Sequence, residues 1–278
     1  MVEEALRRFL PREGCIPSRL PEAMRYSVFS GGKRIRPLLV LASCHAVGGD
    51  PQKALPFACA LEMIHTYSLI HDDLPSMDND DYRRGRATSH RVFGEALAIL
   101  AGDALLTDAF GLMSSPGARE GIAPEVALSV IHEVARAVGS EGMVGGQAVD
   151  VEVEGKEVDG GLIQWIHERK TAAFILAAVK IGGMLGGAED EELSALDRFG
   201  RAFGMAFQLV DDILDSQEEK SANMARLIGV EKARARAMEH FQDAYRALDA
   251  FGERGEPLRE IAHTIEEFIR DGEDFGRD

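Results

Sequence analysis

Apolar residues recur three and four positions apart along most of this chain, and runs of β-branched residues are few. A repeat of about 3.6 residues is typical of amphipathic α-helices. We therefore predict helices over residues 54–71, 93–113, 124–144, 193–214 and 230–251. Glycine- and proline-rich breaks follow at residues 31–32, 48–51, 115–117, 145–146, 160–161 and 186–187. No turn signal joins two alternating runs, so strands are not expected. The pattern predicts an all-α helical bundle that forms a single domain over residues 1–278.

Composition and charge narrow the possible functions of the 278 residues. The chain has 31 Lys plus Arg against 47 Asp plus Glu, a formal net charge of −16, which disfavours nucleic acid as a partner. Its three cysteines contain no CxxC pair, so we expect neither disulfides nor a thiolate metal site, and a cytoplasmic location. The apolar stretch 172–188 is interrupted by Lys180 and four glycines, so no membrane span is expected. The acidic N-terminus does not fit a secretory signal.

A first cluster of aspartates follows the apolar helix expected over residues 54–71. Pro75 disfavours helical geometry at the residue before it, so this helix should end near Asp73. Asp72 and Asp73 then occupy the negative end of the helix dipole, where carboxylates are disfavoured unless a cation is bound. The break at Pro75 would allow Asp78 to fold back toward Asp72. This arrangement makes shared metal coordination possible.

A second cluster, Asp211, Asp212 and Asp215, lies in another apolar helical stretch. Asp211 and Asp215 are four residues apart, so both project from one face of the helix. Like charges on a largely buried helix are destabilising unless a cation neutralises them. Oxygen ligands select hard ions such as Mg²⁺, which usually binds through a few carboxylates together with substrate phosphates. The two clusters therefore predict Mg²⁺ and a phosphorylated ligand.

Basic residues near these clusters fit a phosphorylated ligand, because arginine and lysine bind phosphate oxygens. They are Lys33, Arg34, Arg36, Arg83, Arg84 and Lys170. Simpler interpretations exist for each feature: a single DDxxD is usually a solvated acidic face, and the Gly31-Gly32 pair could serve only a turn. His65, His71 and Tyr67 would ordinarily be core residues. Two aspartate clusters, each within an apolar helix, favour the metal interpretation over these alternatives.

Several motifs occur in an order that resembles one family. They are GGKRIRP, IHTYSLIHDDLPSMDNDDYRRG, ILAGDALL, GGQAVD, HERKT and FQLVDDILD. Together they resemble the trans-polyprenyl diphosphate synthases, which include the bacterial farnesyl and geranylgeranyl enzymes. The resemblance implies a prenyltransferase with an isoprenoid synthase bundle and a central apolar cavity, normally a homodimer. Such an enzyme joins isopentenyl diphosphate head to tail to an allylic diphosphate, dimethylallyl or geranyl, and needs Mg²⁺.

The resemblance also implies roles for individual residues. The ligands of the Mg²⁺ ions on the allylic diphosphate would be Asp72, Asp73, Asp78, Asp211, Asp212 and Asp215. The residues that contact that diphosphate would be Arg83, Lys170, Thr171 and Gln208. The catalytic residues would be Asp72, Asp73, Asp78, Arg83, Lys170, Asp211 and Asp212. The isopentenyl diphosphate site would comprise Lys33, Arg36, His65 and Arg84.

Product length in the family depends on bulk just before the first cluster, where Tyr67 and Ser68 stand in this chain. An aromatic residue there resembles the farnesyl enzymes, so we predict farnesyl diphosphate as the main product, with geranylgeranyl diphosphate as the alternative. The segment after Asp215, SQEEKSANMAR, is shorter than the family's usual loop. Lys220 would be a remnant of that loop, or the loop is deleted in this protein, or it is omitted from this sequence. A deletion would favour a non-catalytic homologue or partner subunit.

Two other classes of protein share part of this pattern. A di-iron carboxylate bundle would use paired Glu-x-x-His motifs, a spacing that Glu62–His65 and Glu260–His263 satisfy. That class leaves both aspartate clusters and the basic motifs unexplained. A terpene cyclase would share the first cluster, but it would usually replace DDILD with an asymmetric metal motif and would not need the GGKRIRP segment.

Overall fold

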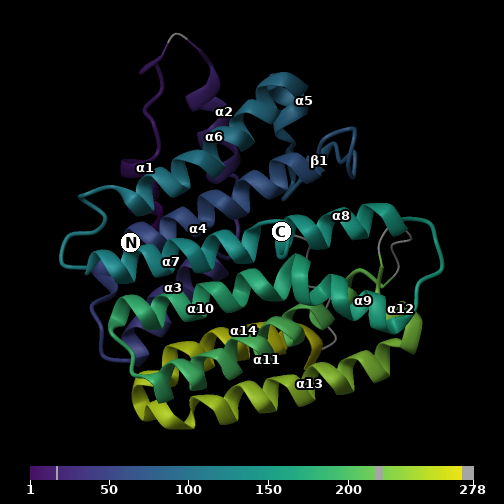
Figure 1. Ribbon diagram of the computed structural model, residues 1–278. Coiled ribbons are helices and arrows are strands. Elements are labelled where there is room, and N and C mark those ends of the chain that lie inside the picture. The colour runs from purple at the N-terminus through teal and green to yellow at the C-terminus, as the bar shows by residue number, and fades with distance from the viewer. Residues whose placement is uncertain (17, 217–221, 271–278) are drawn as a thin grey trace. The chain divides into compact units, whose positions relative to one another are not determined.

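The computed structural model describes residues 1–16, 18–216 and 222–270 (Figure 1). These residues form two compact units, the first made of residues 1–38 and 52–127 and the second of residues 39–51 and 128–270. Both are built almost entirely of helices, which confirms the predicted all-α class. A single domain over residues 1–278 stays a prediction.

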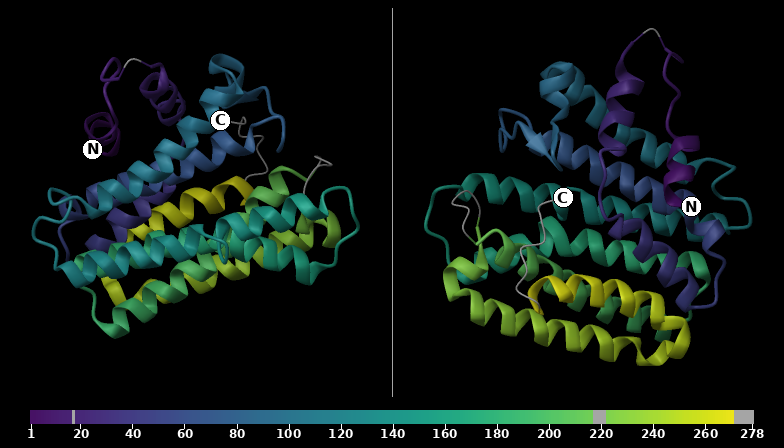
Figure 2. Two further views of the ribbon diagram at one scale, coloured as in Figure 1. Left: turned by 45° about the horizontal axis from the view of Figure 1, so that its top comes forward. Right: turned by 180° about the vertical axis from the view of Figure 1, so that it is seen from behind.

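The first unit is organised around one long buried helix, α4 (Pro51–Asp72). Phe57, Leu61 and Ile64 of this helix are fully buried, because almost the whole circumference of α4 is apolar. In Figure 1 and Figure 2, α6 runs beside α4, and α6 also packs against α2 and α5. The other elements of this unit are α1 (Val2–Phe9), α2 (Leu20–Val28), α5 (Ser89–Phe93), α6 (Glu95–Ser114), β1 (Tyr82–Arg83) and β2 (Arg86–Ala87).

The second unit is organised around α11 (Asp190–Leu214), which packs along α10 and α13. The rings of Phe199 and Phe203 on α11 stack with centroids 5.6 Å apart, and Phe241 of α13 lies 6.5 Å from Phe203. These aromatic residues form much of the core of this unit. The remaining elements are most of α3 (Ile35–Ala46) and α7 (Pro124–Val138), then α8 (Met143–Val153), α9 (Gly160–His167), a π-helical turn (Glu168–Ala172), α10 (Ala173–Gly186), α12 (Met224–Ile228), α13 (Val230–Ala247), a 3₁₀ segment (Leu248–Gly255) and α14 (Glu256–Arg270).

The prediction of one helix over residues 124–144 with a break at 145–146 is wrong. The chain leaves α7 at Val138, and α8 begins after Gly142, whose φ of −122° and ψ of −129° are not helical. Gly145 and Gly146 lie inside α8. A Cβ on Gly145 would lie 2.9 Å from the carbonyl carbon of Ser140. These glycines therefore serve close packing and do not end a helix.

A short antiparallel ladder, β1 with β2, also departs from the prediction of no strands. It is joined by Arg84 and Gly85, which both have positive φ, 52° and 69°. A two-residue turn with positive φ at both positions matches the twist of a hairpin. The usual dipeptide signal has Asn or Asp at the first of these positions, and arginine there hides the hairpin from sequence patterns.

The helix α6 is long and apolar enough to cross a membrane, judged by length and composition alone. The apolar stretch singled out in the sequence, residues 172–188, does not include this helix. One such helix is weak evidence for a membrane span, because buried core helices pass the same test. Ala98, Leu105 and Met113 of α6 are buried within the first unit. Of the apolar stretch of α6 that is long enough to span a membrane, about a third is buried. The absence of a membrane span stays a prediction.

Candidate functional site

The first aspartate cluster folds back on itself at the end of α4. The helix ends at Asp72, as Pro75 predicts, and the backbone N–H of Asp78 donates to the carbonyl of Asp72 at 2.9 Å. This hydrogen bond confirms the expected return of Asp78 toward Asp72. Asp72 is partly exposed and Asp78 is exposed, so both lie where solvent or a ligand can reach the cluster.

Asp73 has different surroundings, because its side chain is buried. The Nε–H of Arg83, on β1, donates to its Oδ1 at 2.6 Å, and Arg83 also lies 3.5 Å from Asp80. Burial raises the pKa of Asp73 to about 6, and the charge of Arg83 opposes that rise. The pair ties the β1–β2 hairpin to the end of α4. It thereby fixes the position of Arg83, which the sequence places among the diphosphate contacts.

Three of the four residues predicted for the isopentenyl diphosphate site, His65, Arg36 and Arg84, interact electrostatically within the first unit. The pKa of His65 lies well below its usual value because of burial and because of the charges of Arg36 and Arg84. Arg84 donates to the carbonyl of Gly31, and a Cβ on Gly32 would lie 2.5 Å from the Arg84 Nη1 atom. The glycine pair therefore allows the loop to wrap closely around Arg84. Such a concentration of positive charge favours an anionic ligand.

Arg34, in the same GGKRIRP segment, has a structural role. Its guanidinium pairs with the buried Glu62 at 2.6 Å and with Glu3 at 2.7 Å, and it donates to the carbonyl of Val28 at 2.7 Å. These contacts fix the loop that carries Lys33, which is exposed. They also engage the carboxylate of Glu62, one of the glutamates that a di-iron centre would need.

The second aspartate cluster lies at the end of α11 in the second unit. The backbone N–H of Asp215 donates to the carbonyl of Asp211 at 2.9 Å. Asp211 is partly exposed and Asp215 is exposed. As in the first cluster, the outer two carboxylates of the motif are accessible while the middle one, Asp212, is buried.

Asp212 connects α11 to α12. Its Oδ2 accepts from the backbone N–H of Met224 at 2.7 Å, and its Oδ1 accepts from the side chain of Gln208 at 3.1 Å. Asn223 donates to the backbone carbonyl of Asp212 at 2.8 Å. Burial raises the pKa of Asp212 to about 7, and the bonds from Met224 and Gln208 oppose that rise.

Two residues of the second unit join the predicted site residues there although sequence reasoning missed them. Asp150 lies 2.6 Å from the Nζ atom of Lys170, and His167 lies 3.4 Å from Oδ2 of Asp212. Burial lowers the pKa of His167 to about 4. Their positions in the sequence could have identified both residues, because Asp150 ends the GGQAVD motif and His167 begins HERKT. Thr171 is partly buried in the same π-helical turn as Lys170.

The turn that carries Lys170 is held in place by close packing. A Cβ on Gly146 of α8 would lie 2.8 Å from the Lys170 Cα atom and closer still to its backbone nitrogen. Only glycine therefore lets α8 approach this turn. π-Helical turns often occur at functional sites.

The accessible carboxylates have the chemistry that Mg²⁺ requires. Within residues 1–16, 18–216 and 222–270, no group of three or more His, Cys, Asp or Glu is arranged to hold a metal by itself. A complete protein cage is not needed, because Mg²⁺ keeps several waters and binds through one or two carboxylates plus substrate phosphates. Asp72 with Asp78, and Asp211 with Asp215, each supply such a pair of hard oxygen donors. The residues present therefore fit Mg²⁺.

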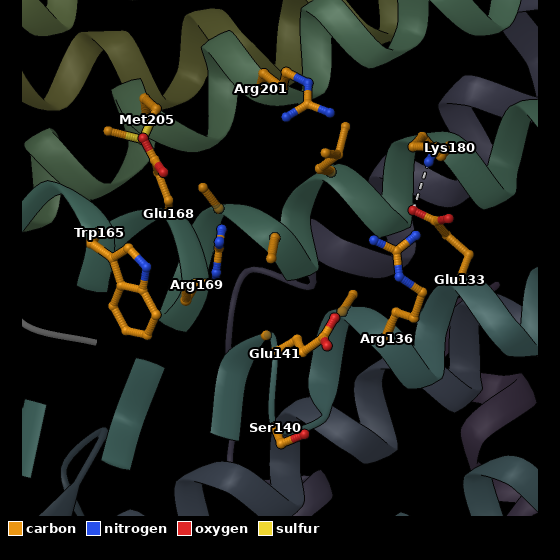
Figure 3. A pocket seen from close by; sticks show the side chains of 15 residues that line it. Glu133, Arg136, Ser140, Glu141, Trp165, Glu168, Arg169, Lys180, Arg201 and Met205 are labelled. Carbon is orange, nitrogen blue, oxygen red and sulfur yellow. Dashed lines mark hydrogen bonds and ion pairs between the residues drawn. The ribbon is translucent and has the colours of Figure 1, made fainter. Parts of the chain in front are cut away.

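A cavity of about 600 Å³ lies elsewhere in the second unit, and Figure 3 shows its side chains. Its charged lining combines four cations with three carboxylates, among them Lys180 and Glu133, which pair at 2.7 Å. The charges nearly balance, so this cavity has little preference for an anion. None of the site residues predicted from the sequence lines it.

Two aspartate clusters, each with accessible and buried carboxylates and each near a fixed arginine or lysine side chain, are typical of metal-dependent enzymes that act on phosphorylated substrates. The chain belongs to the polyprenyl synthetase family, whose model matches residues 17–227. It is 54% identical over 222 residues to a farnesyl diphosphate synthase from Geobacillus stearothermophilus, covering 79% of this chain and 74% of the relative. It is 46% identical over 266 residues to a chloroplastic geranylgeranyl pyrophosphate synthase from Catharanthus roseus, covering 90% and 74%.

Solved structures agree with this assignment. An FPP/GFPP synthase from Zymomonas mobilis matches with a TM-score of 0.88 and 40% identity over 95% of each chain. A geranyltransferase from Legionella pneumophila matches with a TM-score of 0.89 and 33% identity, covering 98% of this chain and 94% of the other. The predicted family and the isoprenoid synthase fold are confirmed. The protein is a prenyltransferase of the trans-prenyl synthase type.

Proposed function

We propose that this protein joins isopentenyl diphosphate to dimethylallyl and geranyl diphosphate in a Mg²⁺-dependent reaction and releases farnesyl diphosphate. The observation that carries this proposal is Tyr67, a bulky side chain that is only 6% exposed and stands five residues before Asp72 in the apolar core of α4. A large ring there would limit the room for a growing chain. The relative named farnesyl diphosphate synthase supports this product, and those named geranylgeranyl synthases keep the longer product as the alternative.

In this proposal the accessible and the buried aspartates of each cluster have different roles. The accessible pairs, Asp72 with Asp78 and Asp211 with Asp215, would hold Mg²⁺. The buried Asp73 and Asp212, which the resemblance also places among the ligands, would instead position the structure around these pairs. Bound Mg²⁺ would supply charge stabilisation as negative charge develops on the departing diphosphate.

The chain's own cations would act on the diphosphates directly. Arg83 and Lys170, each held by an aspartate at 2.6 Å, would bind the allylic diphosphate together with Thr171 and Gln208. Fixed donors of this kind stabilise developing charge without reorganising during the reaction. The isopentenyl diphosphate would be bound by basic side chains without metal, namely Lys33, Arg36, His65 and Arg84.

The test is to incubate the purified protein with isopentenyl diphosphate, Mg²⁺ and each of dimethylallyl, geranyl and farnesyl diphosphate, and to identify products by chain length. Farnesyl diphosphate should dominate with the two shorter starters. Replacement of Tyr67 by alanine should lengthen the product. An unchanged product distribution in the Tyr67 variant contradicts the assignment of Tyr67.

The short segment after Asp215 favours one alternative, a non-catalytic homologue or partner subunit. Lys220, the remnant predicted from the sequence, lies outside the described residues. Absence of elongation with every starter would support this alternative and contradict the proposed activity.

We also propose that the enzyme acts in the cytoplasm as a homodimer without crossing a membrane. All three cysteines are free, with Cys44 and Cys59 buried, as suits a reducing compartment. Exposed apolar residues on α5 and α6 support the dimer.

A further inference from the structure

The ring of Tyr67 rests against His71, one helical turn further along α4. The two ring centroids are 5.7 Å apart and the planes meet at 82°, an edge-to-face contact. Such contacts favour a defined orientation of both rings. The orientation of Tyr67 therefore depends on where His71 is held.

His71 is held by α6. Its Nε2 atom lies 3.1 Å from the carbonyl oxygen of Ile99 and 3.9 Å from Oδ1 of Asp103. A carbonyl oxygen only accepts hydrogen bonds, so Nε2 carries the proton in this contact. The bond fixes the plane of the imidazole ring against α6.

The space for this ring is provided by Gly102 of α6. A Cβ at this position would lie 2.5 Å from Cδ2 of His71 and closer still to Nε2. Glycine is unfavourable inside a helix, and Gly102 has no need of an unusual backbone conformation because it lies within regular α6. Gly111 on the same helix has nothing within 4 Å of its ideal Cβ position. Gly102 is thus distinguished from Gly111 by the imidazole that packs on it.

We propose that His71 and Gly102 are positioning residues that set product length by holding the ring of Tyr67. This inference rests on the proposed function, in which Tyr67 limits the growing chain. The Ile99 carbonyl on α6 holds His71, and Gly102 leaves the space that His71 needs to reach it. The His71 ring in turn orients the ring of Tyr67. Loss of either positioning residue frees the Tyr67 ring to turn aside, so longer products form.

The experiment compares Gly102→Ala with Gly111→Ala, the same change on the same helix without a neighbouring side chain. In Gly102→Ala the added methyl displaces His71 from the Ile99 carbonyl. The ratio of C20 to C15 product, measured with dimethylallyl diphosphate as starter, should rise at least threefold. Gly111→Ala should keep the parent's ratio.

Two variants of His71 separate the ring contact from the hydrogen bond. His71→Ala removes both and should raise the ratio most, whereas His71→Phe keeps an aromatic edge against Tyr67 and should lie between His71→Ala and the parent. A merely structural role would change stability and total turnover without this order in the product ratio. His71→Ala adds no atoms, so it keeps the test decisive if Gly102→Ala does not fold.

The outcomes separate this inference from the proposed function. A parent protein that elongates no starter contradicts the proposed function, and the placement of His71 is then tested by NMR, because Gly102→Ala should shift the His71 ring protons and Gly111→Ala should not. A folded, active His71→Ala with the parent's product ratio overturns the inference, as does an unmoved His71 signal in Gly102→Ala.

Discussion

The two accessible aspartates of the first cluster differ from their buried neighbour in their exposure to solvent. Asp78 is exposed and is connected to Asp72 through the backbone, whereas Asp73 is buried in a pair with Arg83. Removing one partner of a buried charged hydrogen bond leaves the other unsatisfied. We therefore propose that the same motif contains residues that bind ligand and a residue that stabilises the fold.

Replacement of these residues should separate stability from activity. Asp73→Ala should lower the free energy of unfolding by about 2 kcal/mol, because Arg83 loses a charged hydrogen bond. Asp78→Asn should leave stability unchanged and greatly reduce turnover at low Mg²⁺. Urea unfolding and a Mg²⁺ titration of turnover measure the two effects. Equal loss of stability in both variants would contradict this division.

The low pKa of His65 predicts a pH dependence of stability. Burial and the charges of Arg36 and Arg84 keep His65 neutral in the folded protein, while in the unfolded chain it takes up a proton below about pH 6.5. The stability contributed by His65 is therefore present above about pH 6.5 and lost as pH falls toward its lowered pKa. The melting temperature between pH 7.5 and 5.5 should fall by about 2–4 °C less in His65→Gln than in the parent.

The comparison of variant with parent removes the contribution of other groups that titrate in this range, such as Asp73. His132, an exposed histidine of α7, provides the control, because His132→Gln should follow the parent. An identical pH profile for His65→Gln and the parent would refute the prediction.

At the scale of elements, the contact between α8 and the π-helical turn decides where Lys170 lies. Gly146 approaches the backbone of this turn, and Asp150 of the same helix pairs with the Lys170 side chain. One helix thus positions both the main chain and the charge of Lys170. The turn then presents that charge without relying on the flexibility of a long side chain.

Gly146→Ala should separate α8 from this turn. The added methyl would overlap the Lys170 backbone, and overpacking of this kind typically costs about 1–3 kcal/mol. We expect a destabilised protein with turnover reduced more than tenfold. Gly117→Ala, at a glycine with nothing within 4 Å of its ideal Cβ, is the control for both measurements. Parent-like turnover in Gly146→Ala would show that the close contact is unimportant.

Sequence periodicity predicts the long amphipathic helices best. It recovers α4, α6 and α11 within a few residues, because apolar spacing and Pro75 act locally. It fails at Gly145 and Gly146, where glycine permits close packing against Ser140 before α8 and against Lys170, which is distant in sequence. The same limit applies to the site: residue types identified both aspartate clusters, but the difference between buried and accessible aspartates depends on partners from other elements.

For the whole molecule, the net charge of −16 contrasts with the apolar residues on the surface of the first unit. Val92 on α5 and Ile99 and Leu100 on α6 are 39%, 42% and 53% exposed. Single exposed apolar residues are ordinary, but a group on adjoining helices indicates an interaction surface. A second copy of the chain would cover this surface, as the proposed homodimer requires.

Leu100→Glu should therefore convert the dimer to a monomer, since it places a charge on that surface, where burial without a partner is costly. Sedimentation equilibrium measures the change, and the dissociation constant should rise at least a hundredfold. Leu227→Glu, at a leucine of α12 that is 49% exposed, should leave the dimer intact. If the parent is monomeric and sediments with lipid vesicles while Leu100→Glu does not, α6 contacts a membrane and the dimer proposal fails.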